Sequence, residues 1–533
     1  MSNRPNPDSL NSLVLAGIGN DLAAVAVLEG DDQFTFAELL VGAHLLNQEL
    51  HEIPRSLPIG VLGRPSFATY VAILACCLAG RPWVPLNPKF PSKKTLAVVN
   101  RSELTTLFVE RKELEIPDSG KGSQAGLNNI CIPEVLQAGQ FRNSERWSPE
   151  TCRELLSGFG ALETHEMSDL AYLMFTSGST GEPKGVEVTR SNLLAFLEGF
   201  RQVIEFSSAD RFSGFFDITF DLSVFDIFVS WSSGAAVAPL DDVSRVVPGK
   251  FINQHELTVW FSVPSMAALL ADRGLLVGQS APSLRYSLFC GEALSYAVAG
   301  SWTEFAGESA LFNLYGPTEV TIACSYYEVD LSDPKLANSR ETVPIGKPFP
   351  SMSVALLGED GKFQATQVKG ELAMSGPQVA KGYFLDSQRT QESFAFIDGL
   401  EGGPWYRTGD IAFREHDDSL SFVGRVDSQV QRKGFRVELG EVEQALREET
   451  GCETVVAVYV SDSQGGDIVG FVSDKCNRTA KSVIEGLRET LPGYMIPSDI
   501  FFMADFPQNS NGKIDRAGLQ KKALLQKQGQ KSE

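Results

Sequence analysis

The chain reads Leu170-Ala-Tyr-Leu-Met-Phe175 and continues as Thr176-Ser-Gly-Ser-Thr-Gly-Glu-Pro-Lys-Gly185. The apolar run is short and bounded by polar residues, so it predicts a buried strand that ends in a glycine-rich loop. Backbone amides and hydroxyl groups of such a loop can surround phosphate oxygens, while Lys184 offsets their charge. A Gly/Ser surface turn without function would have a similar composition. The spacing lacks the G-x-x-x-x-G-K-[ST] pattern, which disfavours a P-loop nucleoside triphosphatase.

The residues around this stretch alternate between strand and helix patterns. Thr35 and Glu38 fit a capping box at the start of a helix. The next predicted elements are a strand at Ile59–Leu62, a helix at Phe67–Leu78 and a strand at Trp83–Leu86. A strand, a helix and a second strand of this kind build parallel sheets. Ligands of open parallel sheets bind where the strands give way to loops, which is where the glycine loop falls.

The pattern continues after the glycine loop. A helix is expected at Asn192–Phe200, and strands are expected at Val259–Ser262, Tyr286–Phe289 and Leu311–Leu314. An aromatic segment between them carries Asp217, Asp221 and Asp226. Carboxylates among so many apolar residues are costly unless they are paired or exposed. The simplest interpretation places one or two of them at a helix start, where they cap backbone amides.

The remaining segments are more polar or richer in glycine. Residues 111–165 show weak periodicity, which predicts a variable segment that runs over the surface before the glycine loop. From Ile345 short segments separated by glycines predict a small β-rich part, and the charged stretch Gly424–Ser428 marks a domain boundary. The last expected elements are a helix at Glu441–Glu449, a strand at Thr454–Val460, a helix at Ser482–Leu491 and a solvated, lysine-rich tail after Leu519.

The predicted fold class is therefore α/β and α+β. Residues 1–426 should form a large N-terminal domain of two α/β subdomains with parallel-type sheets and a small β-rich subdomain. Residues 427–520 should form a small, mobile C-terminal α+β domain, followed by the tail at 521–533. A chain of 533 residues is too long for a single hydrophobic core, which agrees with several folding units.

Composition excludes some classes of function. The net charge of -21 disfavours nucleic acid or an anionic membrane as a partner, and an anionic substrate would need locally placed cations. The eight cysteines have no C-x-x-C spacing and the five histidines are scattered, so neither a zinc site nor a disulfide framework is indicated. The N-terminus lacks an apolar signal region and no apolar run approaches about 18 residues, so a cytoplasmic protein is expected.

Several separate segments agree on one family. In chain order they are TSGSTGEPKG (176–185), FDLS (220–223), NLYGPTE (313–319), YRTGD (406–410), GRVDSQVQRKGFRVELGEVE (424–443) and NGKIDR (511–516). Together they resemble the adenylate-forming superfamily, specifically the amino-acid-activating adenylation domains of nonribosomal peptide synthesis. The resemblance covers nearly the whole chain, from the region of Phe34 to Arg516. It makes the glycine loop a phosphate-binding loop and the N-terminal domain an adenylation core.

The resemblance implies ATP and Mg²⁺ as cofactors and assigns the ATP site. Phosphates would be held by the loop, Tyr315 would lie against the adenine and Asp410 would accept from the ribose hydroxyls. Thr318 would contact the α-phosphate, Glu319 would hold magnesium and Arg425 would lie beside the ribose. The full implied set is Thr176, Ser177, Gly178, Ser179, Thr180, Lys184, Asn313, Tyr315, Gly316, Thr318, Glu319, Asp410 and Arg425.

Lys513 is the residue that the resemblance marks as essential for catalysis. Its ammonium group would contact both the substrate carboxylate and the α-phosphate. Asp427 matches the hinge about which the small domain would turn, removing Lys513 and bringing the region of Gly434 to the site to admit a thiol. One departure is Gln431, where such domains often carry a basic residue, so a ribose-side contact there is in doubt.

The resemblance also implies a substrate pocket. Asp221 matches the position that pairs with the α-ammonium group of an amino acid, a residue that plain acyl-CoA ligases usually lack. The remaining wall would be Leu222, Phe225, Met266, Leu288, Cys290, Leu314, Ile322 and Ala323, where Met266, Leu288 and Cys290 could be displaced by one position. This apolar lining resembles that of prolyl-adenylating enzymes, so L-proline is expected, with alanine, cysteine and valine as alternatives.

The expected activity is that of an aminoacyl-[carrier protein] ligase in natural-product biosynthesis. It would form the aminoacyl-AMP, release pyrophosphate and pass the aminoacyl group to the phosphopantetheine thiol of a separate carrier protein. No phosphopantetheine site follows NGKIDR, which favours a free-standing enzyme. We also expect a monomer or a weak dimer. Arg432, Lys433 and Arg436 could contact an acidic carrier. The alternatives are an acyl-CoA ligase for a small carboxylic acid and an inactive regulatory homologue.

Overall fold

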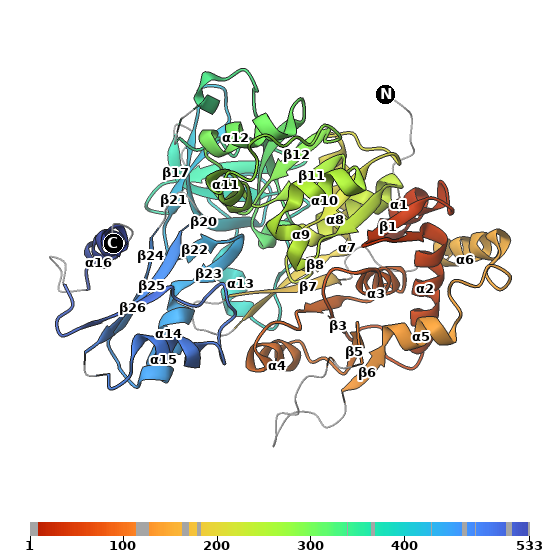
Figure 1. The fold of residues 1–533 in the computed structure, drawn as a ribbon, viewed down its shortest axis with the longest axis horizontal. Coiled ribbons are helices and arrows are strands. Elements are labelled where there is room, and N and C mark those ends of the chain that lie inside the picture. Colours follow the sequence, from red (N-terminus) through yellow and green to blue (C-terminus); the bar gives the residue numbers. More distant parts are fainter. Residues whose placement is uncertain are drawn as a thin grey trace.

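A seven-stranded sheet contains the strand that leads into the glycine loop (Figure 1). The fold comes from a computed structural model, which describes residues 9–112, 114, 127–161, 170–177, 183–337, 339, 341–363, 368–427, 429–460, 466–474, 476–507 and 514–530. The strand order is β18-β8-β7-β4-β3-β5-β6, parallel from β7 to β6 and antiparallel where β8 joins. The strands are β3 (Ile59–Leu62), β4 (Trp83–Leu86), β5 (Thr106–Val109), β6 (Asn128–Cys131), β7 (Leu170–Thr176), β8 (Lys184–Thr189) and β18 (Gly382–Tyr383).

The inner strands of this sheet are apolar along their whole length. All residues of β3, β4 and β5 are buried, as is usual for parallel strands that are covered on both faces. Ser66 caps α3 by accepting from the Thr69 amide, and the apolar face of α3 packs onto the sheet. The helices of this part are α1 (Leu10–Gly19), α2 (Phe36–Glu49), α3 (Phe67–Leu78), α4 (Ser92–Arg101), α5 (Ile132–Ala138), α6 (Pro149–Ala161) and α13 (Ser387–Ser393).

A second, nine-stranded sheet has the order β15-β14-β13-β12-β11-β9-β10-β1-β2. Its strands are β1 (Val25–Glu29), β2 (Asp32–Thr35), β9 (Arg211–Gly214), β10 (Ala236–Pro239), β11 (Val259–Ser262), β12 (Tyr286–Phe289), β13 (Ala310–Tyr315), β14 (Ser325–Glu328) and β15 (Lys347–Pro348). The helices are α7 (Arg190–Arg201), α8 (Leu222–Ser233), α9 (Asp242–Val246), α10 (Pro248–His255), α11 (Pro264–Asp272) and α12 (Tyr296–Ala306), with short 3₁₀ turns η1 (Thr318–Val320) and η2 (Pro334–Ala337).

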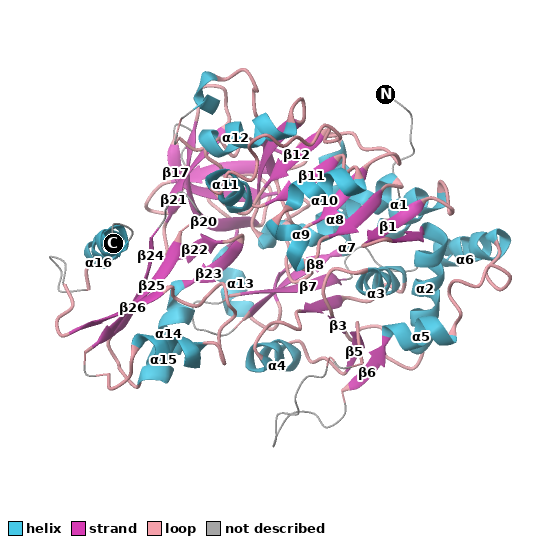
Figure 2. Cartoon of the chain, viewed as in Figure 1, coloured by secondary structure: helices cyan, strands magenta, loops and turns pink. Residues whose placement is uncertain are grey.

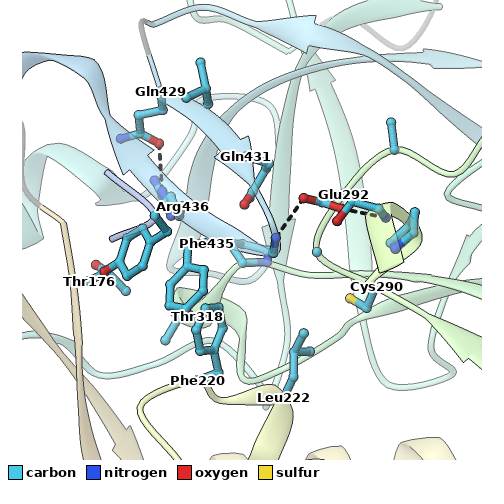
Figure 3. Close-up of a pocket in the computed structure, with 18 of the residues that line it drawn as sticks. Thr176, Phe220, Leu222, Cys290, Glu292, Thr318, Gln429, Gln431, Phe435 and Arg436 are labelled. Carbon is cyan, nitrogen blue, oxygen red and sulfur yellow. Dashed lines mark hydrogen bonds between the residues drawn. The ribbon is translucent and has the colours of Figure 1, made fainter. Parts of the chain in front are cut away.

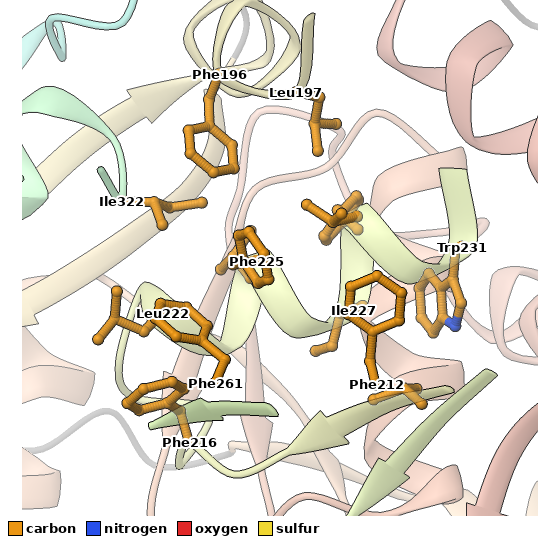
Figure 4. Close-up of a cluster of buried hydrophobic side chains, with 14 of the residues drawn as sticks. Phe196, Leu197, Phe212, Phe216, Leu222, Phe225, Ile227, Trp231, Phe261 and Ile322 are labelled. Carbon is orange, nitrogen blue, oxygen red and sulfur yellow. The ribbon is translucent and has the colours of Figure 1, made fainter. Parts of the chain in front are cut away.

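Helix α8 is buried along its whole length between this sheet and α7 (Figure 4). The ring of Phe225 meets Phe200 at 4.9 Å and Phe261 at 4.7 Å, both edge to face. Aromatic pairs of this kind add to the free energy gained from burying the rings themselves. The aromatic segment around Asp221 is therefore a rigid core element, and the start of α8 is held in a fixed position.

The C-terminal part of the chain contains smaller sheets (Figure 2). The β-rich part consists of β16 (Ser353–Leu357), β17 (Lys369–Ser375), β19 (Phe394–Ala395), β20 (Trp405–Arg414) and β21 (Leu420–Arg425). The C-terminal domain follows with β22 (Gln429–Arg432), β23 (Phe435–Glu438), α14 (Leu439–Thr450), β24 (Val455–Val460), β25 (Asp467–Ser473), α15 (Ala480–Leu487), β26 (Asp499–Met503) and α16 (Arg516–Gln530). None of the helices within the described residues is long and apolar enough to cross a membrane.

The predicted fold class is confirmed: a large N-terminal domain of mixed α/β sheets precedes a small C-terminal domain. The capping box of Thr35 and Glu38 is present, and α3 and β4 have the predicted bounds. The predicted helix at 482–491 begins at Ala480 and ends at Leu487.

Two expectations about surface segments were wrong. The variable segment predicted at 111–165 contains β6, α5 and α6 within its described residues. The tail expected to be solvated from residue 521 belongs to α16 as far as Gln530, and Leu519 and Ala523 are fully buried against β24 and β25. These two apolar residues lie about one helical turn apart, so a mostly polar helix still packs along one face.

Candidate active site

A cleft of about 1450 Å³ lies where loops of both large sheets face the β22–β23 hairpin (Figure 3). Strands β7, β12 and β13 all end at this cleft, so the topology places the polar residues that follow them together. The predicted residues that line it are Thr176, Ser177, Asp221, Leu222, Cys290, Leu314, Tyr315, Gly316, Thr318, Asp410, Arg425 and Asp427.

Asp221 occupies the position before α8 but does not cap the helix, contrary to the simplest interpretation of the sequence. Its side chain is turned into the cleft wall, only 7% of the residue is exposed, and Oδ2 has no hydrogen-bond partner among the described residues. Burial raises the pKa of Asp221 to about 7, opposed by the Thr318 side chain and the Ile322 amide. Ile322 has a φ of 71°, which is rare for a β-branched residue and is typical of functional sites. No described side chain forms an ion pair with this carboxyl group.

The wall around Asp221 is apolar, but it is smaller than expected. Leu222, Cys290 and Leu314 line the cleft, together with Gly316 and Gly291. Ser265 lines it in place of Met266, because Pro264 begins α11 and the helix turns Met266 away. The other expected wall residues are buried behind the lining and do not reach it: Phe225, Leu288, Ile322 and Ala323.

Glu319 lies at the centre of a buried charge network. Its Oε1 accepts from Lys184 Nζ at 3.0 Å and from the Tyr383 hydroxyl at 2.7 Å, and its Oε2 accepts from Arg436 Nη1 at 3.0 Å. Burial alone would raise the pKa of Glu319, but the charges of Arg436 and Lys184 hold it well below its ordinary value. The network thus favours the ionised form of the buried carboxyl group, and Tyr383 is a member of this network that the sequence motifs did not indicate.

An ionised carboxylate of this kind fits a hard cation such as Mg²⁺ in charge and in donor chemistry. In the present arrangement, however, Arg436 of the C-terminal domain occupies the Oε2 side of Glu319. Both Lys184 and Glu319 lie just behind the residues that line the cleft. In this arrangement Arg436 therefore pairs with the carboxylate oxygen on the side that faces the C-terminal domain.

Asp410 is shared between two neighbours of the predicted ATP site. Its Oδ2 accepts from the Tyr315 hydroxyl at 2.5 Å, and its Oδ1 pairs with Arg425. Arg425 also donates to both carboxylate oxygens of Asp427, at 2.7 and 2.8 Å. Burial raises the pKa of Asp410 against the opposing charge of Arg425. The expected hinge residue is thus linked to the expected ribose site through a single guanidinium group.

The β22–β23 hairpin closes one side of the cleft. Ser177 donates to the Arg436 carbonyl at 2.8 Å, and the Gly434 amide donates to Glu292 Oε1 at 2.7 Å. The ring of Phe435 lies 4.2 Å from that of Phe220 and stacks on Tyr494 at 3.6 Å. The region around Gly434 therefore lies at the site, the arrangement that the resemblance associates with admission of a thiol.

Some predicted residues do not contribute to this geometry. Gly178, Ser179, Thr180 and Lys513 lie outside the described residues. Asn313 is buried and donates to the carbonyls of residues 343 and 344, so it supports the segment before β15 instead of facing the cleft. Gln431 lines the cleft from β22, near Glu292 (Figure 3).

Two family models match most of the chain. Residues 19–384 match the model described as AMP-binding enzyme, and residues 441–513 match the AMP-binding enzyme C-terminal domain. The D-alanine--D-alanyl carrier protein ligase of Bacillus licheniformis is 28% identical over 517 residues, which is 94% of this chain and 97% of that protein. Tyrocidine synthase 3 of Brevibacillus parabrevis is 29% identical over 526 residues, but these are 97% of this chain and only 8% of the synthase.

A solved structure has the same fold over almost the whole length. It is the Vibrio cholerae adenylation domain AlmE in complex with glycyl-adenosine-5'-phosphate, with a TM-score of 0.85 and 28% identity. The match covers 98% of this chain and 99% of that one. The cleft described above therefore belongs to a fold that holds an acyl-adenylate in a relative.

Proposed function

Since this chain belongs to the AMP-binding enzyme family and is an adenylate-forming ligase, we propose that it activates a small amino acid as the aminoacyl-adenylate. The second step would transfer the aminoacyl group to a phosphopantetheine thiol on a carrier protein. The names of two relatives agree with these steps, because one is a D-alanyl carrier protein ligase and the other holds a glycyl-adenylate.

The buried carboxyl group of Asp221, whose Oδ2 has no hydrogen-bond partner among the described residues, is the observation that carries the proposal. A buried carboxylate without a cationic partner is costly, and an α-ammonium group in the cleft would supply that cation. The neighbouring wall of Leu222, Cys290 and Leu314 offers no charge to a substrate side chain. The proposed substrate is therefore an amino acid with a small, uncharged side chain.

L-Proline, the expectation from the resemblance, is one member of this class, beside alanine, cysteine and valine. An apolar wall separates substrates that differ by one methylene by only about 1–3 kcal/mol, so selectivity within the class should be modest. One relative is named as a D-alanine ligase and another holds a glycyl-adenylate, which favours the smallest members.

In the first step a substrate carboxylate oxygen attacks the α-phosphorus of ATP, the new O–P bond forms, and pyrophosphate leaves. The reaction brings anions together, so positioning and charge neutralisation supply most of the catalysis. Lys184 and the glycine loop would hold the departing phosphates, and Thr318 would contact the α-phosphate. Mg²⁺ would be held by Glu319, where it would neutralise phosphate charge once Arg436 has withdrawn.

The nucleoside would lie beside Tyr315, Asp410 and Arg425, whose mutual hydrogen bonds already orient them. Lys513 would bridge the substrate carboxylate and the α-phosphate after the C-terminal domain, from residue 427, turns about Asp427. In the second step the thiol sulfur attacks the carbonyl carbon, the thioester forms, and AMP leaves with the acyl C–O bond broken. The thiol proton passes to solvent.

The test is ATP–pyrophosphate exchange across a panel of amino acids. We expect exchange with alanine, glycine, proline, cysteine or valine, and none with charged amino acids or with propionate. Exchange that requires no α-amino group would refute the role of Asp221 and favour an acyl-CoA ligase. Faster exchange with proline than with alanine and glycine would confirm L-proline as the substrate, and the reverse order would overturn that expectation.

A further inference from the structure

One carboxylate joins the C-terminal domain to the wall of the cleft. Glu292 follows β12, in the turn Gly291-Glu292, and lies at the cleft (Figure 3). Its Oε2 accepts from the Ser265 amide, in the first turn of α11, at 2.9 Å. Its Oε1 accepts from the Gly434 amide, in the turn of the β22–β23 hairpin, at 2.7 Å. A single side chain thus bridges two backbone amides that belong to different domains.

The hairpin turn is shaped for this contact. Lys433 and Gly434 have φ values of 53° and 81°, the two positive values that a tight two-residue hairpin turn requires. A Cβ atom on Gly434 would lie 2.5 Å from Val263 Cγ1, so the backbone of the turn sits directly against the wall. Because no side chain separates them, the Gly434 amide can reach Glu292.

The contact also satisfies groups that burial would otherwise leave unpaired. Glu292 is half-buried between the turn and α11, whereas Gly434 and Ser265 are buried, and a buried amide without an acceptor costs free energy. Hydrogen bonds to an ionised carboxylate are stronger than those between neutral groups. Removal of the Glu292 carboxylate would therefore weaken the hold on the hairpin, although Ser177 and Phe220 also contact it.

We propose that Glu292 is a positioning residue for thioester formation. It holds the β22–β23 hairpin in place, and the hairpin forms the wall along which the acceptor thiol approaches the acyl-adenylate. This inference rests on the proposed function and assigns a task within its second step. The first step needs the C-terminal domain turned the other way, so that Lys513 faces the cleft. In that arrangement Glu292 does not contact the hairpin. Removal of its carboxylate should therefore slow thioester formation more than adenylate formation.

The variant that tests the proposal is Glu292→Gln. Glutamine keeps the length of the side chain, but its single amide oxygen can accept from only one of the two amides, and its NH₂ group faces the other donor. Two rates are compared: pyrophosphate exchange with the best amino acid of the panel, and single-turnover transfer from enzyme-bound adenylate to free pantetheine. The transfer rate should fall at least about tenfold further than the exchange rate. The matched control is Glu308→Gln, at an exposed glutamate of the same domain, for which the two rates should change together.

A second readout does not depend on activity. Amide hydrogen exchange of residues 429–438 in the free enzyme should become at least about fivefold faster in Glu292→Gln, because the docked hairpin is lost more often. Residues 455–460 of β24 lie in the C-terminal core and should be unchanged, which separates undocking from unfolding. Gly434→Ala, which introduces the clash with Val263, should reproduce the effect, and the double variant should be no worse than the more impaired single variant.

Equal losses in the two rates, or unchanged hydrogen exchange in residues 429–438, would overturn the role of Glu292. A wild-type enzyme without amino-acid-dependent exchange would instead refute the proposed function. The hydrogen-exchange comparison would still decide whether Glu292 holds the hairpin.

Discussion

Replacement of Asp221 by asparagine tests the site through its electrostatics. Burial raises the pKa of Asp221 to about 7 from an ordinary 3.8, so the folded protein binds this proton more tightly than the unfolded chain does. Ionisation of the carboxyl group therefore destabilises the free enzyme. The penalty is absent below about pH 4, grows as the pH rises to about 7, and is constant above that. An asparagine side chain cannot ionise, so the variant avoids the penalty.

The size of the penalty follows from the two pKa values. Their difference corresponds to a destabilisation of the folded protein by about 4 kcal/mol when Asp221 is fully ionised. This is an upper value, because structural relaxation and entry of water offset part of the cost. At pH 5 only about 1.5 kcal/mol of it is present. We expect Asp221→Asn to be more stable than the wild type without substrates, by about 2–3 kcal/mol more at pH 8 than at pH 5.

The assay combines unfolding with activity. Thermal unfolding of both proteins, without ATP or amino acid, is followed at pH 5 and pH 8, and the difference in Tm should be larger at pH 8. Amino-acid-dependent exchange of the variant should fall at least about 100-fold, because the bound ammonium group would be left without its partner. A Tm difference that is equal at both pH values, or a variant with unimpaired exchange, would refute the reasoning.

Further variants test the other assigned residues. Lys513→Ala should nearly abolish adenylate formation, measured as pyrophosphate exchange, yet spare transfer from pre-made adenylate; wild-type exchange would contradict its assignment. Lys184→Ala should slow adenylation only moderately, because the loop amides still bind the phosphates, and a loss as complete as that of Lys513→Ala would contradict this. Asp427→Pro should block the turn of the C-terminal domain, so that adenylation falls in pre-steady-state assays, and unchanged kinetics would argue for another hinge. Glu319→Gln should raise the Mg²⁺ concentration needed for half-maximal exchange at least about tenfold, and an unchanged Mg²⁺ dependence would place the metal elsewhere.

The elements that the sequence predicted best are those with the strongest patterns. Helix α3 and strands β3 and β4 are apolar and buried throughout, so their bounds could be read from the residues. Helix α16 was missed because only Leu519 and Ala523 mark its buried face among many lysines and glutamines. Helices α5 and α6 were missed because their segment is polar and shows little periodicity.

The motifs predicted several residues that line the cleft, but they did not predict contacts between residues that are distant in the sequence. Asp221 and Asp410 follow from motifs, whereas Glu292 follows a strand in a Gly-Glu pair that resembles an ordinary turn. Its partner Gly434 is 142 positions away, and the Glu319–Arg436 pair spans 117 positions. Contacts of this length depend on how two domains are arranged, which local patterns do not encode. The same holds for Tyr383, whose hydroxyl reaches Glu319 only in the folded chain.

Detection of the first product tests the central claim most directly. The enzyme is incubated with ATP, Mg²⁺ and alanine or another small amino acid, and the products are measured by mass spectrometry. We predict an aminoacyl-AMP that appears only when the amino acid is present, in an amount equal to the pyrophosphate released. Formation of ADP and phosphate, or of an adenylate only from acids that lack the α-amino group, would contradict the account.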